Sequence, residues 1–194
     1  YLSPASWLRK QAQMVKDAGV KPELECFDTG HVSFAKQLVK EGLVEQPMFQ
    51  FCLGIPWGAE NDAQTLDYLI SRIPEGAQWS AFGIGRMQLP TVREVAKRGG
   101  NIRVGLEDNL YISKGVKATN EALVEEAKKI MKEYDLVPLT PAEAREKLNL
   151  KNNKGEVIED YKTDDKYNDI KMVVLVNEGS ASASEILAGA INDL

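Results

Sequence analysis

The chain of 194 residues has only two cysteines, one histidine and no long apolar run. Two cysteines are too few for a disulfide framework, and both stand in apolar stretches, so we expect Cys26 and Cys52 to be reduced core thiols of a cytoplasmic protein. No segment has the roughly 20 apolar residues of a membrane span. The start, Tyr1-Leu-Ser-Pro, resembles neither a signal peptide nor an obvious native N-terminus. A net charge of −5 argues against nucleic acid as a partner, and the lack of an apolar run argues against a membrane.

What is present is the composition of an ordinary globular domain, with 43% hydrophobic and 27% charged residues. Strand-like and helix-like patterns alternate up to about residue 150, with Gly and Pro at each change. The predicted strands span residues 23–27, 48–53, 78–82 and 101–106. The predicted helices span residues 6–18, 32–40, 63–73, 91–98 and 120–134. This alternation predicts βαβ units, a parallel sheet and right-handed crossovers.

Polar and glycine residues cluster just after each predicted strand, at residues 28–31, 54–58, 83–86 and 107–109. In a (β/α)8 barrel, the loops at this end of the strands form the catalytic face. About four βα units are visible, so residues 1–150 are predicted to form half of such a barrel. Four parallel strands with two open edges would be a poor stable structure alone.

The character of the sequence changes near residue 150. Thr140 and Glu143 form an N-cap signature for a short helix that ends near residue 148. Residues 151–171 are polar and turn-rich, which is typical of a linker. Residues 172–194 read as a strand followed by a helix.

The segment Arg103-Val-Gly-Leu-Glu-Asp-Asn109 places a cation, two acids and an amide around the end of a predicted buried strand. A carboxylate there is costly unless it is paired or binds a metal. This segment and three others resemble the C-terminal half of the β-keto acid cleavage enzymes, the family of the 3-keto-5-aminohexanoate cleavage protein. The other three segments are Lys21-Pro-Glu-Leu-Glu-Cys-Phe-Asp-Thr-Gly-His31, Phe49-Gln-Phe-Cys-Leu-Gly54 and Trp79-Ser-Ala-Phe-Gly-Ile-Gly-Arg86. The loop at residues 55–60 departs from the family pattern.

The resemblance implies a zinc-dependent, reversible Claisen-type exchange in which a β-keto acid and acetyl-CoA become acetoacetate and a new CoA ester. It implies that Glu107 is a zinc ligand, that Asp108 is the general base, and that Arg103 orients this base and stabilises enolate charge. Arg103 and Glu107 are an even number of residues apart, so they could share one face of an extended strand. Glu25 ends an inward-facing strand and is expected to meet the polar tail of the substrate.

Each of these predicted roles has a simpler structural alternative. Arg103 with Glu107 or Asp108 could be a structural ion pair, and His31 is more typical of a loop or helix cap than of a zinc ligand. The family's two zinc-binding histidines belong to an earlier strand that this sequence does not contain. A catalytic zinc usually has three protein ligands. We therefore expect that the chain alone does not hold the metal.

A second resemblance covers residues 170–194, which are similar to the nucleophile segment of the carboxyl-terminal processing peptidases, Ser/Lys enzymes with a crotonase-like fold. It implies that Ser182 is the nucleophile and that the backbone N–H of Ala183 lies in the oxyanion hole. A Ser-rich helix cap is the simpler alternative. The general-base lysine is expected some two dozen residues after Ser182, beyond Leu194, so no peptidase activity is expected.

Segments of two families in one chain suggest a hybrid, a truncated chain or a mis-joined gene. The first hypothesis is a cytoplasmic, zinc-dependent β-keto acid cleavage enzyme that is incomplete in this chain and acts as a homo-oligomer. A fragment of a carboxyl-terminal processing serine peptidase and a non-enzymatic half-barrel scaffold are the alternatives.

Overall fold

A computed structural model describes residues 3–150 of the chain. Its helices are α1 (Ala5–Asp17), α2 (Thr29–Lys40), α3 (Ala63–Arg72), α4 (Gln88–Lys97), α5 (Asn120–Lys132) and α6 (Pro141–Lys147), with a 3-10 turn η1 (Gly85–Met87) before α4. Its strands are β1 (Glu23–Cys26), β2 (Met48–Leu53), β3 (Gln78–Gly83), β4 (Asn101–Ile102) and the pair β5 (Tyr111–Ser113) and β6 (Val116–Lys117). The predicted linker at 151–171 and the predicted strand and helix at 172–194, with their crotonase-like fold, lie outside the described residues.

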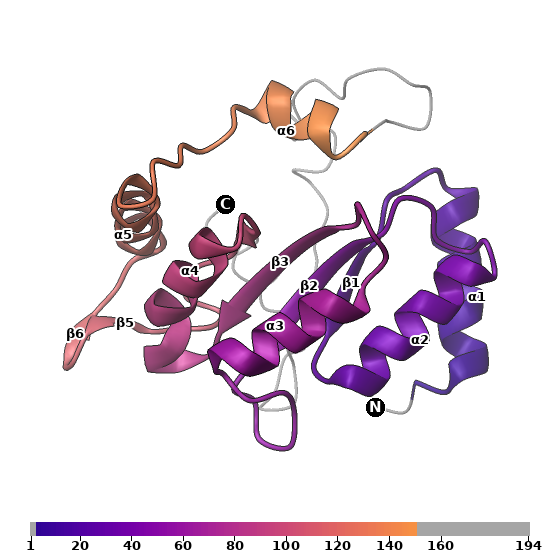
Figure 1. Ribbon diagram of the computed structural model, residues 1–194, viewed down its shortest axis with the longest axis horizontal. Helices are drawn as coiled ribbons and strands as arrows, with labels where there is room; N and C mark the ends of the chain where they lie inside the picture. Colours follow the sequence, from indigo (N-terminus) through magenta and orange to yellow (C-terminus); the bar gives the residue numbers. More distant parts are fainter. Residues whose placement is uncertain (1–2, 151–194) are drawn as a thin grey trace, which may run out of the picture. The chain divides into compact units, whose positions relative to one another are not determined.

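The four main strands form one parallel sheet in the order β1-β2-β3-β4 (Figure 1). Each strand is the neighbour of the next one in the sequence, and a helix connects each pair. This α/β arrangement agrees with the predicted partial (β/α)8 barrel, in which consecutive strands also lie side by side.

One face of the sheet is apolar and packs under α2, α3 and α4, which lie across it in Figure 1. Leu24, Phe49 and Phe51 alternate along β1 and β2 and belong to this core, as do Leu66 and Leu69 of α3. Successive side chains of a strand point to opposite faces of a sheet. The residues between these positions therefore face the other side, and they include the polar Glu25, Gln50 and Ser80.

Four of the described helices start at short side chains that accept hydrogen bonds from otherwise unpaired backbone N–H groups. Asp28 caps α2, Asp62 caps α3 and Thr119 caps α5. Thr140 and Glu143 form a reciprocal capping box at α6, as their spacing predicts.

The fourth strand is much shorter than predicted, and the prediction that residues 103–106 belong to it is wrong. β4 pairs with β3 only at Asn101 and Ile102. The chain then turns, and the N–H groups of Asp108 and Asn109 both donate to the carbonyl oxygen of Gly105. A strand at the edge of the described sheet has hydrogen-bond partners on one side only, so local turn bonds replace the ladder here.

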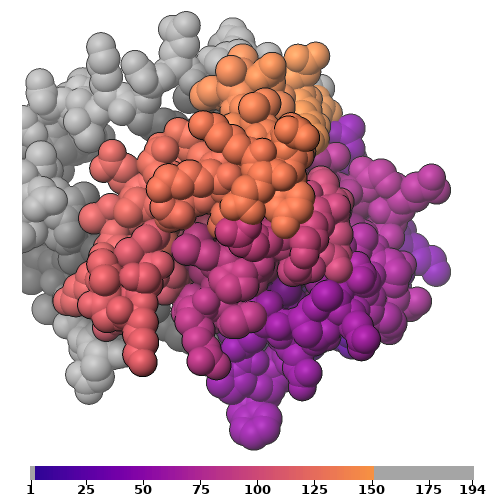
Figure 2. Space-filling model, turned by 60° about the vertical axis from the view of Figure 1, so that its left-hand side comes forward, coloured from indigo at the N-terminus to yellow at the C-terminus, as the bar shows by residue number. Residues whose placement is uncertain are grey.

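Beyond this turn, α5 packs beside α4 (Figure 2). The contact is apolar, with Val92 of α4 against Ala127 and Ile130 of α5. It fixes the helix that follows the Arg103–Asn109 turn against the rest of the described structure.

Cys26 and Cys52 are free and buried, as predicted. Burial raises the pKa of each thiol to about 12. Since thiolates are the reactive form, both side chains are inert core thiols.

Among the described helices, none has the length and apolar character to cross a membrane.

Candidate active site

The predicted cation and acids meet on the polar face of the sheet, where Arg103 follows β4. Its guanidinium donates from Nε to Asp108 Oδ2 and from Nη2 to Asp108 Oδ1, both at 2.9 Å. The Asp108 side chain is 4% exposed and that of Arg103 is 26% exposed. This is a two-bond, largely desolvated ion pair, the strongest geometry available to these two groups.

Three other acceptors surround the same guanidinium. Nη1 donates to Gln50 Oε1 at 2.6 Å, Nη2 lies 3.2 Å from Glu107 Oε2, and Nη1 lies 3.7 Å from Glu25 Oε1. The guanidinium carbon also lies 4.0 Å from the centre of the Phe82 ring, a cation–π contact. The cation is thus held on one side by an aromatic face and at its edges by oxygen atoms.

The turn that carries Asp108 is fixed from two directions. From the η1–α4 side, Gly85 N–H donates to the Asp108 carbonyl oxygen at 2.7 Å, and Gln88 Nε2 donates to Gly105 O at 2.9 Å. From the α5 side, the backbone N–H of Leu106 donates to Asn120 Oδ1 at 2.8 Å. Bonds of this kind hold a catalytic group in place when it stands on a loop.

Burial raises the pKa of the Asp108 carboxyl, and the Arg103 hydrogen bonds and charge partly offset this effect. Burial also raises the pKa of Glu25, again opposed by Arg103. For Arg103, burial opposes the charge, but the hydrogen bonds and charge of Asp108 leave its pKa above the ordinary value. A carboxylate with a raised pKa is a stronger base than an ordinary aspartate.

The structure brings Arg103, Glu107, Asp108 and Glu25 together, but the backbone that places them differs from the predicted one. Arg103 and Glu107 meet across a turn and do not share the face of an extended strand, because β4 ends at Ile102. The Glu107 side chain is 73% exposed, so its carboxylate is open to a ligand.

His31 lies in the first turn of α2. Its Nδ1 accepts the backbone N–H of Phe27 at 3.1 Å, and its ring packs edge-on against that of Phe27. The loop or capping interpretation describes this environment better than the interpretation as a zinc ligand. Within residues 3–150, no three His, Cys, Asp or Glu side chains are grouped as they would be around a metal ion. Without such a group, the described part does not fit a catalytic zinc unless further ligands are supplied.

Gln50 is the functional candidate that the sequence predictions missed. It occupies the third position of the otherwise apolar strand β2 and is 4% exposed. A polar residue inside an apolar strand must find a hydrogen-bond partner, so its position was a usable signal. Its partner, however, is 53 residues away along the chain.

A hollow of about 640 Å³ adjoins Arg103 on the polar face of the sheet. Gln50 and Ser80 line it from the sheet, and Val124 and Met131 line it from α5. It offers both a charged wall and an apolar wall to a bound molecule.

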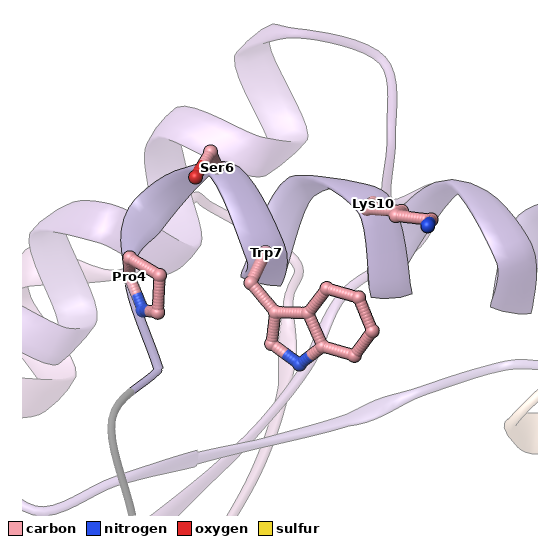
Figure 3. A pocket seen from close by; sticks show the side chains of 4 residues that line it. All are labelled: Pro4, Ser6, Trp7 and Lys10. Carbon is pink, nitrogen blue, oxygen red and sulfur yellow. The ribbon is translucent and has the colours of Figure 1, made fainter.

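A second hollow, of about 510 Å³, lies on α1 and is lined by Pro4, Ser6, Trp7 and Lys10 (Figure 3). Lys10 Nζ lies 5.3 Å from the centre of the Trp7 ring. No carboxylate lines this hollow, whereas Glu23 lines the first one together with Arg103.

A comparison with known families identifies the protein family of this chain. The model of the β-keto acid cleavage enzymes matches residues 1–150. The chain belongs to the β-keto acid cleavage enzyme family. The Arg103–Asp108 pair therefore lies in a member of an enzyme family, at the end of the sheet where barrel enzymes carry their catalytic residues.

Curated relatives of the family are similar over the same region. The 3-dehydrocarnitine:acetyl-CoA trimethylamine transferase of Rhizobium meliloti is 47% identical over 146 residues, which are 75% of this chain and 49% of the relative. The 3-keto-5-aminohexanoate cleavage enzyme of Fusobacterium nucleatum is 37% identical over 78% of this chain and 56% of its own length. The enzyme of the same name from Acetoanaerobium sticklandii is 40% identical over 71% and 50%. The chain spans about half the length of these curated relatives.

The model of peptidase family S41 matches residues 113–194. This match begins well before the predicted boundary at residue 170 and overlaps the match to the β-keto acid cleavage enzymes. Ser182 and Ala183 lie outside the described residues, so their predicted roles stay predictions.

Proposed function

We propose that this chain supplies the acid–base half of a β-keto acid cleavage site. The reaction exchanges the acyl groups of a β-keto acid and acetyl-CoA, so that one carbon–carbon bond and one thioester break and one of each forms. The products are acetoacetate and the CoA ester of the acyl group released from the substrate. The observation that carries the proposal is the buried, two-bond pair between Arg103 and Asp108 in a member of this family.

In this proposal, Asp108 is the general base. It accepts a proton from the carbon between the ketone and the carboxylate of the substrate, the most acidic C–H of a β-keto acid. Burial makes the Asp108 carboxylate more basic, while Arg103 holds its two oxygens and leaves their other lone pairs free. The same guanidinium then lies next to the negative charge that develops as the proton leaves.

Glu107 and Glu25 are proposed to bind rather than to transfer protons. Glu107 is open and is the proposed zinc ligand, and the described residues hold no group of three side chains that could bind a metal, so the other ligands would come from outside residues 3–150. When bound, zinc would polarise the oxygens of the substrate. Glu25 lies at the rim of the Arg103 site and would meet a polar or cationic substrate tail.

The test of the proposal supplies the half of a relative to which this chain has no counterpart in the match. The half of the Rhizobium relative that this chain does not match is produced separately and mixed with this chain, zinc, acetyl-CoA and a panel of β-keto acids. We expect acetoacetate and the matching CoA ester to appear in the mixture and neither half to produce them alone. If the halves do not associate, they are fused into one chain. A folded fusion without exchange activity would overturn the proposal.

We also propose that the protein is a homo-oligomer. In the described sheet, β1 and β4 each pair with one strand only, and unpaired strand edges favour association. Light scattering of the purified chain should give a mass of at least twice the 21.5 kDa of one copy. A mass of one copy at micromolar concentration would contradict this.

A further inference from the structure

Gln50 has a fixed orientation on the polar face of the sheet. Its Nε2 donates to Glu23 Oε1 at 2.8 Å, and its Oε1 accepts from Arg103 Nη1 at 2.6 Å. An ionised glutamate only accepts hydrogen bonds and an arginine only donates them. The amide of Gln50 therefore cannot be reversed without losing both bonds, and Glu23 determines that the oxygen faces Arg103.

This oxygen accepts from the one guanidinium nitrogen that Asp108 does not bind. Nε and Nη2 of Arg103 bind the two oxygens of Asp108, and Nη1 binds Gln50. Together with the Phe82 ring at 4.0 Å, these bonds define both the plane and the rotation of the cation.

Without Gln50, Arg103 would have a competing partner. Glu25 Oε1 lies 3.7 Å from the same Nη1, too far for a good hydrogen bond but close enough to attract the charge. A guanidinium that turned towards Glu25 would lose the parallel alignment of its two bonds to Asp108.

We propose that Gln50, oriented by Glu23, is a positioning residue that holds Arg103 in the plane in which it binds both oxygens of Asp108. Its catalytic importance rests on the proposed function, whereas its effect on Arg103 is a property of the chain itself. The alternative is a structural hydrogen bond that stabilises the sheet and does not affect the orientation of Arg103.

The Gln50→Met variant distinguishes the positioning role from the structural one, because methionine has a volume similar to that of glutamine and no amide oxygen. Nitrogen-15 NMR of the full chain follows the Nε–H of Arg103, with Arg103→Lys used to assign its signal. We expect this N–H to exchange with water about tenfold faster in Gln50→Met, because a guanidinium that can turn opens its bond to Asp108 more often.

Two variants of Glu23 test the orientation of the amide. Glu23→Ala removes the acceptor that fixes Gln50 and should also speed the exchange of the Arg103 Nε–H with water, whereas Glu23→Gln retains an acceptor oxygen and should keep the wild-type exchange rate. Thr91→Val is the matched control, since Thr91 is 2% exposed and hydrogen-bonds to Asn61 and Met87, away from Arg103.

An unchanged exchange rate of the Arg103 Nε–H in a folded Gln50→Met variant would overturn the positioning role. That result differs from a failure of the proposed function, which would appear as a wild-type fusion without acyl-exchange activity and would leave the faster N–H exchange in place. In an active fusion, Gln50→Met should lower kcat about tenfold with little change in KM, as expected when only the alignment of Arg103 changes.

Discussion

Replacing Arg103 with alanine should lower the free energy of unfolding by about 3 kcal/mol, because the substitution leaves the Asp108 carboxylate buried without its cation. The Asp108 side chain is only 4% exposed, so water does not replace the two lost bonds. The 26% exposure of Arg103 places the expected loss near the lower end of the range for buried pairs. Urea unfolding of the full chain, followed by far-UV circular dichroism, measures it.

Arg9→Ala is the control for this variant. Arg9 also donates Nε and Nη2 to the two oxygens of one carboxylate, that of Glu41, and also lies over an aromatic ring, that of Phe34. The two sites differ in burial, since the Glu41 side chain is 27% exposed and that of Asp108 is 4% exposed. The loss in Arg9→Ala should be a small fraction of the loss in Arg103→Ala. Equal losses would show that the burial of Asp108 contributes nothing.

The layout of the described fold could be predicted because its signals are local. An aspartate or threonine before an amphipathic run is enough to start a helix, and α3 and α5 begin at the predicted residues, Ala63 and Asn120. Strands β2 and β3 likewise begin where the apolar runs begin, at Met48 and Gln78.

Helices α2 and α4 start three residues earlier than predicted, but the two larger errors in the fold both concern the region after Ile102. Val104 and Leu106 read as a continuation of the strand, but a strand continues only where a neighbour supplies hydrogen bonds, and this is a property of the sheet. The short hairpin of β5 and β6 was missed for a related reason. Most of its side chains are exposed, and its pattern, Tyr111 to Lys117 around Gly115, lacks the apolar alternation of a buried strand.

In the candidate site too, contacts between residues near in the sequence could be predicted and contacts between distant residues could not. The grouping of Arg103 with Asp108 was predicted from their nearness in the sequence and from the family resemblance. Gln50 lies 53 residues from its partner Arg103, and Phe82 reaches the same cation from β3. Such contacts depend on the strand order and on the register of the sheet, which periodicity alone does not provide.

Asp108→Asn should reduce the exchange rate of the fused or reconstituted enzyme by about 10²- to 10⁴-fold, the usual contribution of a positioned general base. The asparagine has the same shape and retains an oxygen for one Arg103 hydrogen bond, so the loss of basicity is the main change. kcat and kcat/KM should fall together, since the base acts in the transition state and not in substrate binding.

The pH dependence supplies a second test of the same residue. Because burial raises the pKa of Asp108, wild-type activity should fall as the pH drops through a value above that of an ordinary aspartate, about 3.9. Protonation removes the base, so the loss occurs on the acid side, and this limb should disappear from the residual activity of Asp108→Asn. Asp67→Asn, which makes the same change on the exposed surface of α3, should keep both the rate and the limb. An Asp108→Asn enzyme that retains most of the wild-type rate would assign the proton transfer to another group, and Glu25, whose pKa burial also raises, would be the next to substitute.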